Sequence, residues 1–121
     1  MRTRAFVVAE MLLALTARGQ GPGDAARAAR EAAGRGQTTE ALEQVDPEVK
    51  ATAGILIAPL LQDKARKAQA KGGVTSVAVE KVDTVHADHA VVTTVTHYGD
   101  GSTQADSGKV RRVEGKWYIT M

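Results

Sequence analysis

Hydrophobic and polar residues alternate in two different ways along this 121-residue chain. As far as Gly73 the apolar residues recur at the three- and four-residue spacing of helices. From Val74 onward β-branched residues alternate with polar ones, which is typical of strands. Helices followed by antiparallel strands predict an α+β domain, with N-terminal helices packed on one face of a four-stranded antiparallel sheet.

Three helices are predicted after residue 23, over 25–36, 39–45 and 47–71. The first is rich in alanine, and we expect Asp24 to be its N-cap. The third is expected to begin with Asp46 as N-cap, followed at once by a proline, and to end at a pair of glycines.

The third helix carries the longest apolar run, "GILIAPLLQ" at residues 54–62. Pro59 lacks a backbone N–H group and is expected to kink or split the helix near residues 55–59. Two interpretations of this run stay open. It forms a buried core face, or it forms an exposed patch or groove that a partner helix or an acyl chain fills.

Four strands are predicted, over 74–82, 89–98, 103–113 and 116–121. The sequence "GDGS" joins the second strand to the third as a hairpin turn. Trp117 shares one face of the last strand with other apolar residues, so we expect it to fill the core beneath the helices.

The first 17 residues have the order of an export signal, with arginines at positions 2 and 4 before an apolar stretch over 5–17. Residues 15–18, "LTAR", resemble a lipobox in which Arg18 replaces the cysteine that carries the lipid. Because lipidation needs a thiol, the chain as written cannot be lipidated there. Glu10 weakens the signal further, since a carboxylate in an apolar run costs roughly 2–3 kcal/mol on insertion scales.

These features predict a degenerate signal-like helix over 1–18, a linker over 19–23 and one domain over 24–121. The parent form is expected at the periplasmic face of the bacterial cell envelope, held to the membrane by its leader, whereas the Arg18 form is expected to be soluble. The alternative is that the segment is a native helix, docked on its own fold or on a neighbouring copy.

The composition of the chain limits which partners and which reactive groups are expected. The chain has 16 basic and 14 acidic residues, a net charge of +2, and no basic cluster interleaved with aromatics, so no nucleic-acid partner is expected. The basic runs at 64–71 and 109–112 are explained as solvated faces. The absence of cysteine excludes disulfides, thiolate nucleophiles and cysteine-ligated metals.

The histidines and Asp88 are the residues best suited to metal binding. His89 and His97 lie eight residues apart, about 27 Å along an ideal strand, and cannot share an ion. His86 and His89 flank a predicted turn and with Asp88 would form a weak surface site. Since further rigid ligands are missing, we predict exposed histidines, no metal and no cofactor.

Acid–base catalysis would need a carboxylate and a hydroxyl donor inside an apolar cavity. Asp83 and Asp106 are candidate carboxylates, and Tyr98 and Tyr118 are candidate donors. Both aspartates fall near strand ends in polar surroundings, which gives no reason for an activated carboxylate. We therefore predict no catalytic residue.

The stretches "PGDAARAAREAAGRGQTTEALEQV" and "VRRVEGKWYIT" resemble the cystatin-like or NTF2-like superfamily. Within it, the chain is similar to small bacterial lipoproteins of unknown function with a lumazine-binding-like domain, which typically end in a "dGkWkI" strand. Here Glu114 to Ile119 matches that ending, and Gly36-Gln37 stands where a Gly-Asp turn is usual. The resemblance implies a helix-covered curved sheet and carries over no catalytic residue.

Together these observations predict a non-enzymatic envelope module that binds another protein, for instance as an immunity or phage-exclusion factor. The alternative is a carrier of a small apolar ligand in the cone between helices and sheet. Such a cone would be lined by apolar residues of the third helix and the sheet, namely Leu56, Leu60, Val77, Val79, Val92 and Trp117. A homodimer through the open face of the sheet is the expected assembly.

Overall fold

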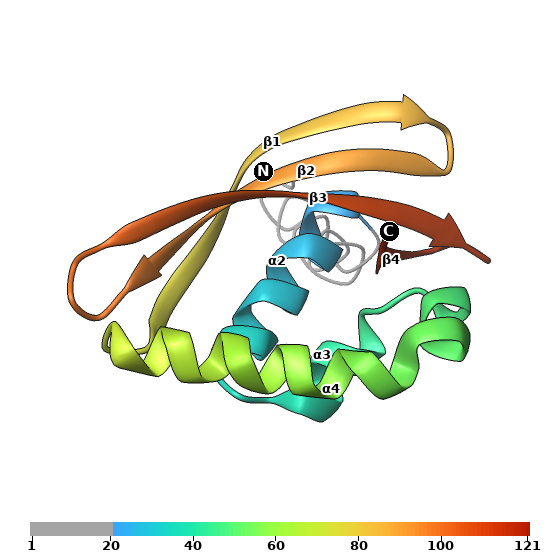
Figure 1. Ribbon diagram of the computed structural model, residues 1–121. Coiled ribbons are helices and arrows are strands. Elements are labelled where there is room, and N and C mark those ends of the chain that lie inside the picture. Colours follow the sequence, from blue (N-terminus) through green and yellow to red (C-terminus); the bar gives the residue numbers. More distant parts are fainter. Residues whose placement is uncertain (1–20) are drawn as a thin grey trace, which may run out of the picture.

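Three helices and a four-stranded antiparallel sheet make up residues 21–121, the part of the chain that the computed structural model describes (Figure 1). The helices are α2 (Pro22–Gly34), α3 (Thr38–Glu43) and α4 (Pro47–Ala70). The strands, in sheet order, are β1 (Val74–His86), β2 (His89–Tyr98), β3 (Thr103–Val113) and β4 (Lys116–Thr120). This arrangement confirms the predicted α+β class.

Helix α2 lies between the sheet and α4, and it supplies most of the helical side of the core (Figure 1). On its sheet side, Ala25 and Ala26 pack in one cluster with Val92, Val110 and Trp117. The predicted role of Trp117 as the core residue beneath the helices is confirmed. On the other side of α2, a second cluster of alanines packs against Leu61 of α4.

The helix starts follow the capping rules only in part. Asp46 caps α4 as predicted, since its Oδ1 accepts the Glu48 N–H at 2.9 Å. The prediction for Asp24 is wrong, because α2 begins at Pro22 with Gly21 as N-cap. Proline is well suited to the first turn, and Asp24 instead lies inside that turn, 3.4 Å from Arg27 Nη2. Residue 22 falls in the stretch expected to be a linker, and residues 1–18 lie outside the described part.

Helix α4 runs through Pro59 without a break, so of the two predicted outcomes, a kink or a split, the split does not occur. The proline removes the donor that would bond the Ile55 carbonyl. Ile55 is 91% exposed, so water can hydrate that carbonyl in place of the missing bond. Leu56 and Leu60 are also exposed, at 66% and 62%, so for these three side chains the core interpretation of the apolar run is wrong.

Two tight turns meet where α4 enters β1. The Gly99 N–H donates to Gly73 O and the Asp100 N–H to Lys71 O, each at 2.9 Å. A Cβ at Gly99 would collide with the carbonyl oxygen of Gly72. This backbone contact fixes the C-terminal end of α4 against the β2–β3 hairpin.

Candidate functional site

A hollow of about 660 Å³ lies between the first turns of α4 and the neighbouring parts of the four strands. Its polar lining consists of Asp46, Glu48, Thr52, His86, His89, Lys109, Arg111 and Thr120. Apolar side chains complete the lining, among them Val49 of α4 and Val85 of β1. Val85 is 63% exposed and Met121 is 77% exposed, so the rim of the hollow is open to solvent.

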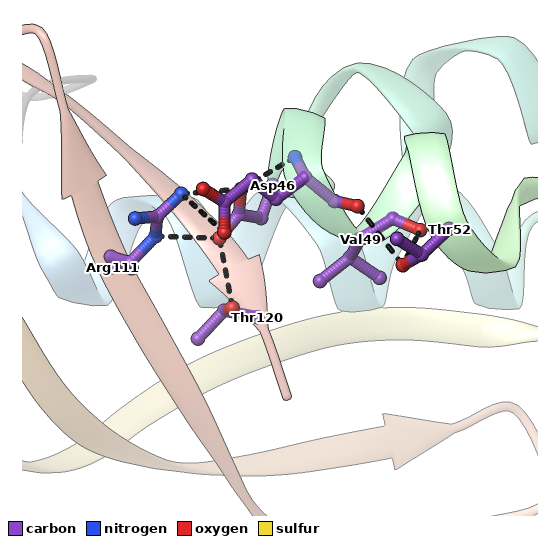
Figure 2. Close-up of polar contacts among 6 residues, drawn as sticks. Asp46, Val49, Thr52, Arg111 and Thr120 are labelled. Atoms are coloured by element: carbon purple, nitrogen blue, oxygen red, sulfur yellow. Dashed lines mark hydrogen bonds and ion pairs between the residues drawn. The ribbon is translucent and has the colours of Figure 1, made fainter.

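A buried carboxylate, Asp46, organises the polar wall of the hollow (Figure 2). Its side chain is 1% exposed. Arg111 donates to it from two nitrogens, Nε to Oδ2 at 2.7 Å and Nη2 to Oδ1 at 2.9 Å. Thr120 Oγ1 donates to Oδ2 at 2.9 Å. With the Glu48 N–H, four donors surround this one carboxylate.

The backbone places Asp46 at this point by extending the edge of the sheet. Val45 forms an isolated parallel bridge with Ile119 of β4. The Ile119 N–H donates to Gln44 O at 2.7 Å, and the Asp46 N–H donates to Ile119 O at 2.8 Å. The start of α4 is therefore attached to the last strand through both backbone and side-chain hydrogen bonds.

The surroundings of Asp46 keep it ionised. The hydrogen bond from Arg111 is the largest cause that lowers its pKa from the ordinary 3.8 to about 2, and it outweighs the burial that acts in the opposite direction. The hydrogen bonds from Glu48 and Thr120 lower this pKa further. Asp46 in turn raises the pKa of Arg111. The pair is therefore a fixed ion pair rather than a proton donor and acceptor.

The two histidines predicted to flank a turn do lie together at the hollow. The rings of His86 and His89 are 5.6 Å apart between centroids and meet edge to face. Asp88, the third member of that candidate group, pairs instead with Arg112 at 3.1 Å. Within residues 21–121, no group of three or more potential ligand side chains is placed to hold a metal ion.

The predicted acid–base candidates are not brought together. Asp83 pairs with Lys81 at 3.6 Å, and Asp106 pairs with Arg30 at 3.7 Å. Tyr98 and Tyr118 each lie beneath a lysine ammonium group. None of these four candidates lines the hollow.

The six residues predicted to line an apolar cone fall into two groups. Three of the strand residues are buried in the molecule, and Val79 is 37% exposed, whereas the two leucines lie exposed on α4. None of the six lines the hollow, which is formed by other residues. Whether they line a ligand cavity stays a prediction, and Arg18 lies outside the described residues. The six are Leu56, Leu60, Val77, Val79, Val92 and Trp117.

Sequence reasoning missed the pairing of Asp46 with Arg111. Each residue carried a local signal, Asp46 as a helix cap and Arg111 as part of a basic strand. Their separation of 65 positions left no signal in the pattern that would join them. Only the closure of β4 against the start of α4 brings the two side chains together.

Among known proteins, solved structures show a similar fold. No helix between residues 21 and 121 is sufficiently long and apolar to cross a membrane. Neither a family model nor a curated protein matches the chain. A crystal structure of a "Putative NTF2-like transpeptidase" from Campylobacter jejuni matches with a TM-score of 0.73 at 20% identity, covering 84% of this chain and 98% of that one.

A solution structure of RPA3114, a SEC-C motif containing protein from Rhodopseudomonas palustris, matches with a TM-score of 0.51 at 17% identity. That match covers 87% of this chain and 88% of the other. At such identities the likeness concerns the fold alone, and the resemblance to lumazine-binding-like lipoproteins stays a prediction. The helices laid on a curved antiparallel sheet, together with the Campylobacter jejuni structure, show that the chain has the NTF2-like fold.

Proposed function

We propose that the protein is a non-enzymatic binding module that takes a segment of another protein into the hollow. The observation that carries this proposal is the meeting of exposed apolar side chains, Val85 and Met121, with fixed charges of both signs at one opening. An apolar surface rimmed by polar groups is typical of interaction sites. Apolar contacts would supply affinity there, and Arg111, Lys109 and Glu48 would orient the bound segment.

The chemistry of the lining supports binding rather than catalysis. Asp46, with a pKa of about 2 and four hydrogen-bond donors around it, is a poor general base at neutral pH. The hydroxyls of Thr52 and Thr120 already donate to acceptors of the fold. The chain has no thiol. The name of the Campylobacter jejuni protein includes transpeptidase, and that activity passes an acyl group through a nucleophile. The engaged hydroxyls and the absence of a thiol therefore support binding rather than this chemistry.

The leader pattern supports a place for this binding at the periplasmic face of the bacterial cell envelope. Expressing the chain with Arg18→Cys in a bacterium, beside the unchanged chain, tests this part. We expect the Arg18→Cys variant to be cleaved, lipidated and recovered with membranes, and the unchanged chain to be intact and soluble. If both chains stay intact and soluble, the envelope location and an immunity or phage-exclusion role lose their support.

A small apolar ligand is the second candidate occupant, and the size of the hollow favours it. Its volume of about 660 Å³ lies inside the range of roughly 300–1,000 Å³ typical of small-molecule sites. Native mass spectrometry of the gently purified protein would detect such a ligand as added mass that disappears in organic solvent.

Site-specific photo-crosslinking distinguishes the two occupants. Benzoylphenylalanine is placed at Val85, on the rim, in the bacterium from which the gene comes. A protein partner in the hollow predicts a discrete protein adduct from Val85 and none from the exposed control position Thr103, which lies outside the hollow. An added small mass without a protein adduct favours the carrier. If neither a protein adduct nor an added mass is found, both proposals are contradicted.

A further inference from the structure

A row of exposed apolar residues runs along the middle of α4, on the side away from α2 and α3. Leu61 marks the packed side, because it lies against the alanine cluster of α2 and α3. At about 100° per residue, Ile55, Leu56 and Pro59 lie roughly 120–160° around the helix from Leu61. Ile55 is 91% exposed, and Leu56 is 66% exposed. We call Ile55, Leu56 and Pro59 the α4 stripe.

Opposite charges stand at the two ends of the α4 stripe. Glu48, at the start of α4, has a side chain that is 80% exposed, and Arg66, near the other end, is 73% exposed. The positions 48, 55, 59 and 66 are spaced by 7, 4 and 7 residues, which keeps them within about 40° of one another on the helix surface. They are also symmetric about residue 57. An antiparallel copy of the same helix would therefore bring each Glu48 against an Arg66.

We propose that α4 is a self-association surface, on which the α4 helix of a second copy packs antiparallel about a two-fold axis near residue 57. A two-fold interface must be self-complementary, and the stripe meets this condition in shape and in charge. The two Ile55 side chains meet the facing Pro59 and Leu56, and the two Glu48–Arg66 pairs close the ends. This second copy is distinct from whatever occupies the hollow, so the inference goes beyond the proposed function.

Other charges near the pair do not prevent it. Arg66 Nη2 already contacts Asp63 Oδ1 at 2.6 Å, but a guanidinium has further N–H donors to offer. Glu48 Oε1 lies 3.6 Å from Arg111 Nη2, a long contact for so exposed a carboxylate. Lys67 contacts Asp63 at 3.0 Å and adds positive charge to the same end. The acidic end and the basic end thus keep opposite signs.

Sedimentation velocity of the full 121-residue chain over a concentration series tests this surface. We expect a monomer–dimer equilibrium that Ile55→Glu weakens by more than about 100-fold, because each substitution acts twice across a two-fold interface. Val82→Glu is the matched control, since Val82 is a 41% exposed apolar residue of β1 that lies outside both α4 and the hollow, and it should leave the equilibrium unchanged. A chain that stays monomeric, or a dimer that Ile55→Glu leaves intact, overturns the proposal.

Charge exchange gives a second test that does not depend on the apolar contacts. Arg66→Glu alone should weaken the dimer about tenfold, and Glu48→Arg alone should do the same, whereas the double variant should restore it. Lys64→Glu, on the opposite side of the helix, should change little. Failure of the double variant to restore the dimer contradicts the antiparallel register.

The absence of cysteine permits a direct probe of what else covers the stripe. An Ile55→Cys chain is labelled with a maleimide in its native state. Slow labelling that speeds up as the protein is diluted supports a second copy. Slow labelling at all concentrations indicates cover from within the chain, and fast labelling at all concentrations indicates an open surface. Either of the last two results overturns the proposal.

Discussion

Removing the Asp46 carboxylate should destabilise the protein more than any other single change at the hollow. In Asp46→Ala, the helix loses its cap and Arg111 loses its ion partner. Breaking a buried ion pair by removing one partner costs about 3–5 kcal/mol, and a lost cap costs about 1 kcal/mol. Arg111 is 27% exposed, so water recovers part of this loss. We expect Asp46→Ala to lower the free energy of unfolding by about 3 kcal/mol.

Asp46→Asn separates the charge from the cap. Asparagine caps helices as well as aspartate does, so this variant keeps the Glu48 contact but loses the negative charge. The lowering of the Asp46 pKa from 3.8 to about 2 corresponds to roughly 2.5 kcal/mol of stabilisation at neutral pH. We therefore expect Asp46→Asn to cost about 2 kcal/mol, less than Asp46→Ala.

The same pair predicts how stability depends on pH. A carboxylate whose folded pKa is depressed stabilises the fold above its unfolded pKa, near 4, and this contribution is lost as the pH falls through the folded pKa, about 2. The protein should therefore lose about 2 kcal/mol through Asp46 between pH 5 and pH 2, and Asp46→Asn should not show this loss. Asp63→Asn is the control, because Asp63 belongs to an exposed ion pair. This variant should still lose the stability that depends on Asp46 between pH 5 and pH 2.

The assay is urea unfolding followed by the fluorescence of Trp117, the only tryptophan in the chain and a member of the core. The midpoint and slope at each pH give the free energy of unfolding. If Asp46→Ala costs less than about 1 kcal/mol, the pair contributes no more than an exposed one, and the reasoning from burial fails. An unchanged pH dependence in Asp46→Asn would refute the assigned pKa direction.

The remaining predictions concern single positions and use the same unfolding assay. Gly99→Ala should destabilise by about 2 kcal/mol, because its methyl group would collide with the backbone of Gly72, and an unchanged midpoint would show that the two turns can separate freely. Gly54→Ala should instead stabilise by up to about 1 kcal/mol, since nothing lies near the added methyl within the described residues and alanine favours the helix. Thr94→Val should stabilise by about 1 kcal/mol, because the buried Thr94 hydroxyl has no hydrogen-bond partner among the described residues; a loss would indicate a bound water there.

Local chemistry could be predicted from the sequence where the responsible residues are neighbours in the chain. Asp46 followed by Pro47 is a helix start by itself, and the glycines at 72 and 73 are a helix end. The strand pattern likewise predicted four antiparallel strands, although β1 runs on to His86 instead of ending at residue 82. The local prediction of Asp24 as the N-cap of α2 was wrong because two helix-start signals compete there. Pro22 starts the helix two residues before Asp24.

The site could not be predicted, because it depends on distant residues and on the direction in which α4 faces. The run 54–62 is apolar on more than one side of the helix, so its pattern cannot tell which side is covered. The alanines of α2 decide this outcome, since they pack against Leu61 and leave Ile55 outside. The pairing of Asp46 with Arg111 is likewise a product of tertiary structure.

The Asp46 contacts join the stability of the fold to both proposed surfaces. Substitutions elsewhere can separate the two surfaces by experiment. Asp46 holds the start of α4 against β4, and α4 contributes one wall of the hollow and the whole α4 stripe. Loss of Asp46 should therefore disturb binding in the hollow and self-association together. Ile55→Glu lies outside the hollow and should disturb self-association alone, whereas a substitution at Val85 should disturb only binding in the hollow. Two single variants that each affect one property, and one that affects both, would show that the two surfaces rest on different apolar residues, although both use Glu48 at the start of one anchored helix.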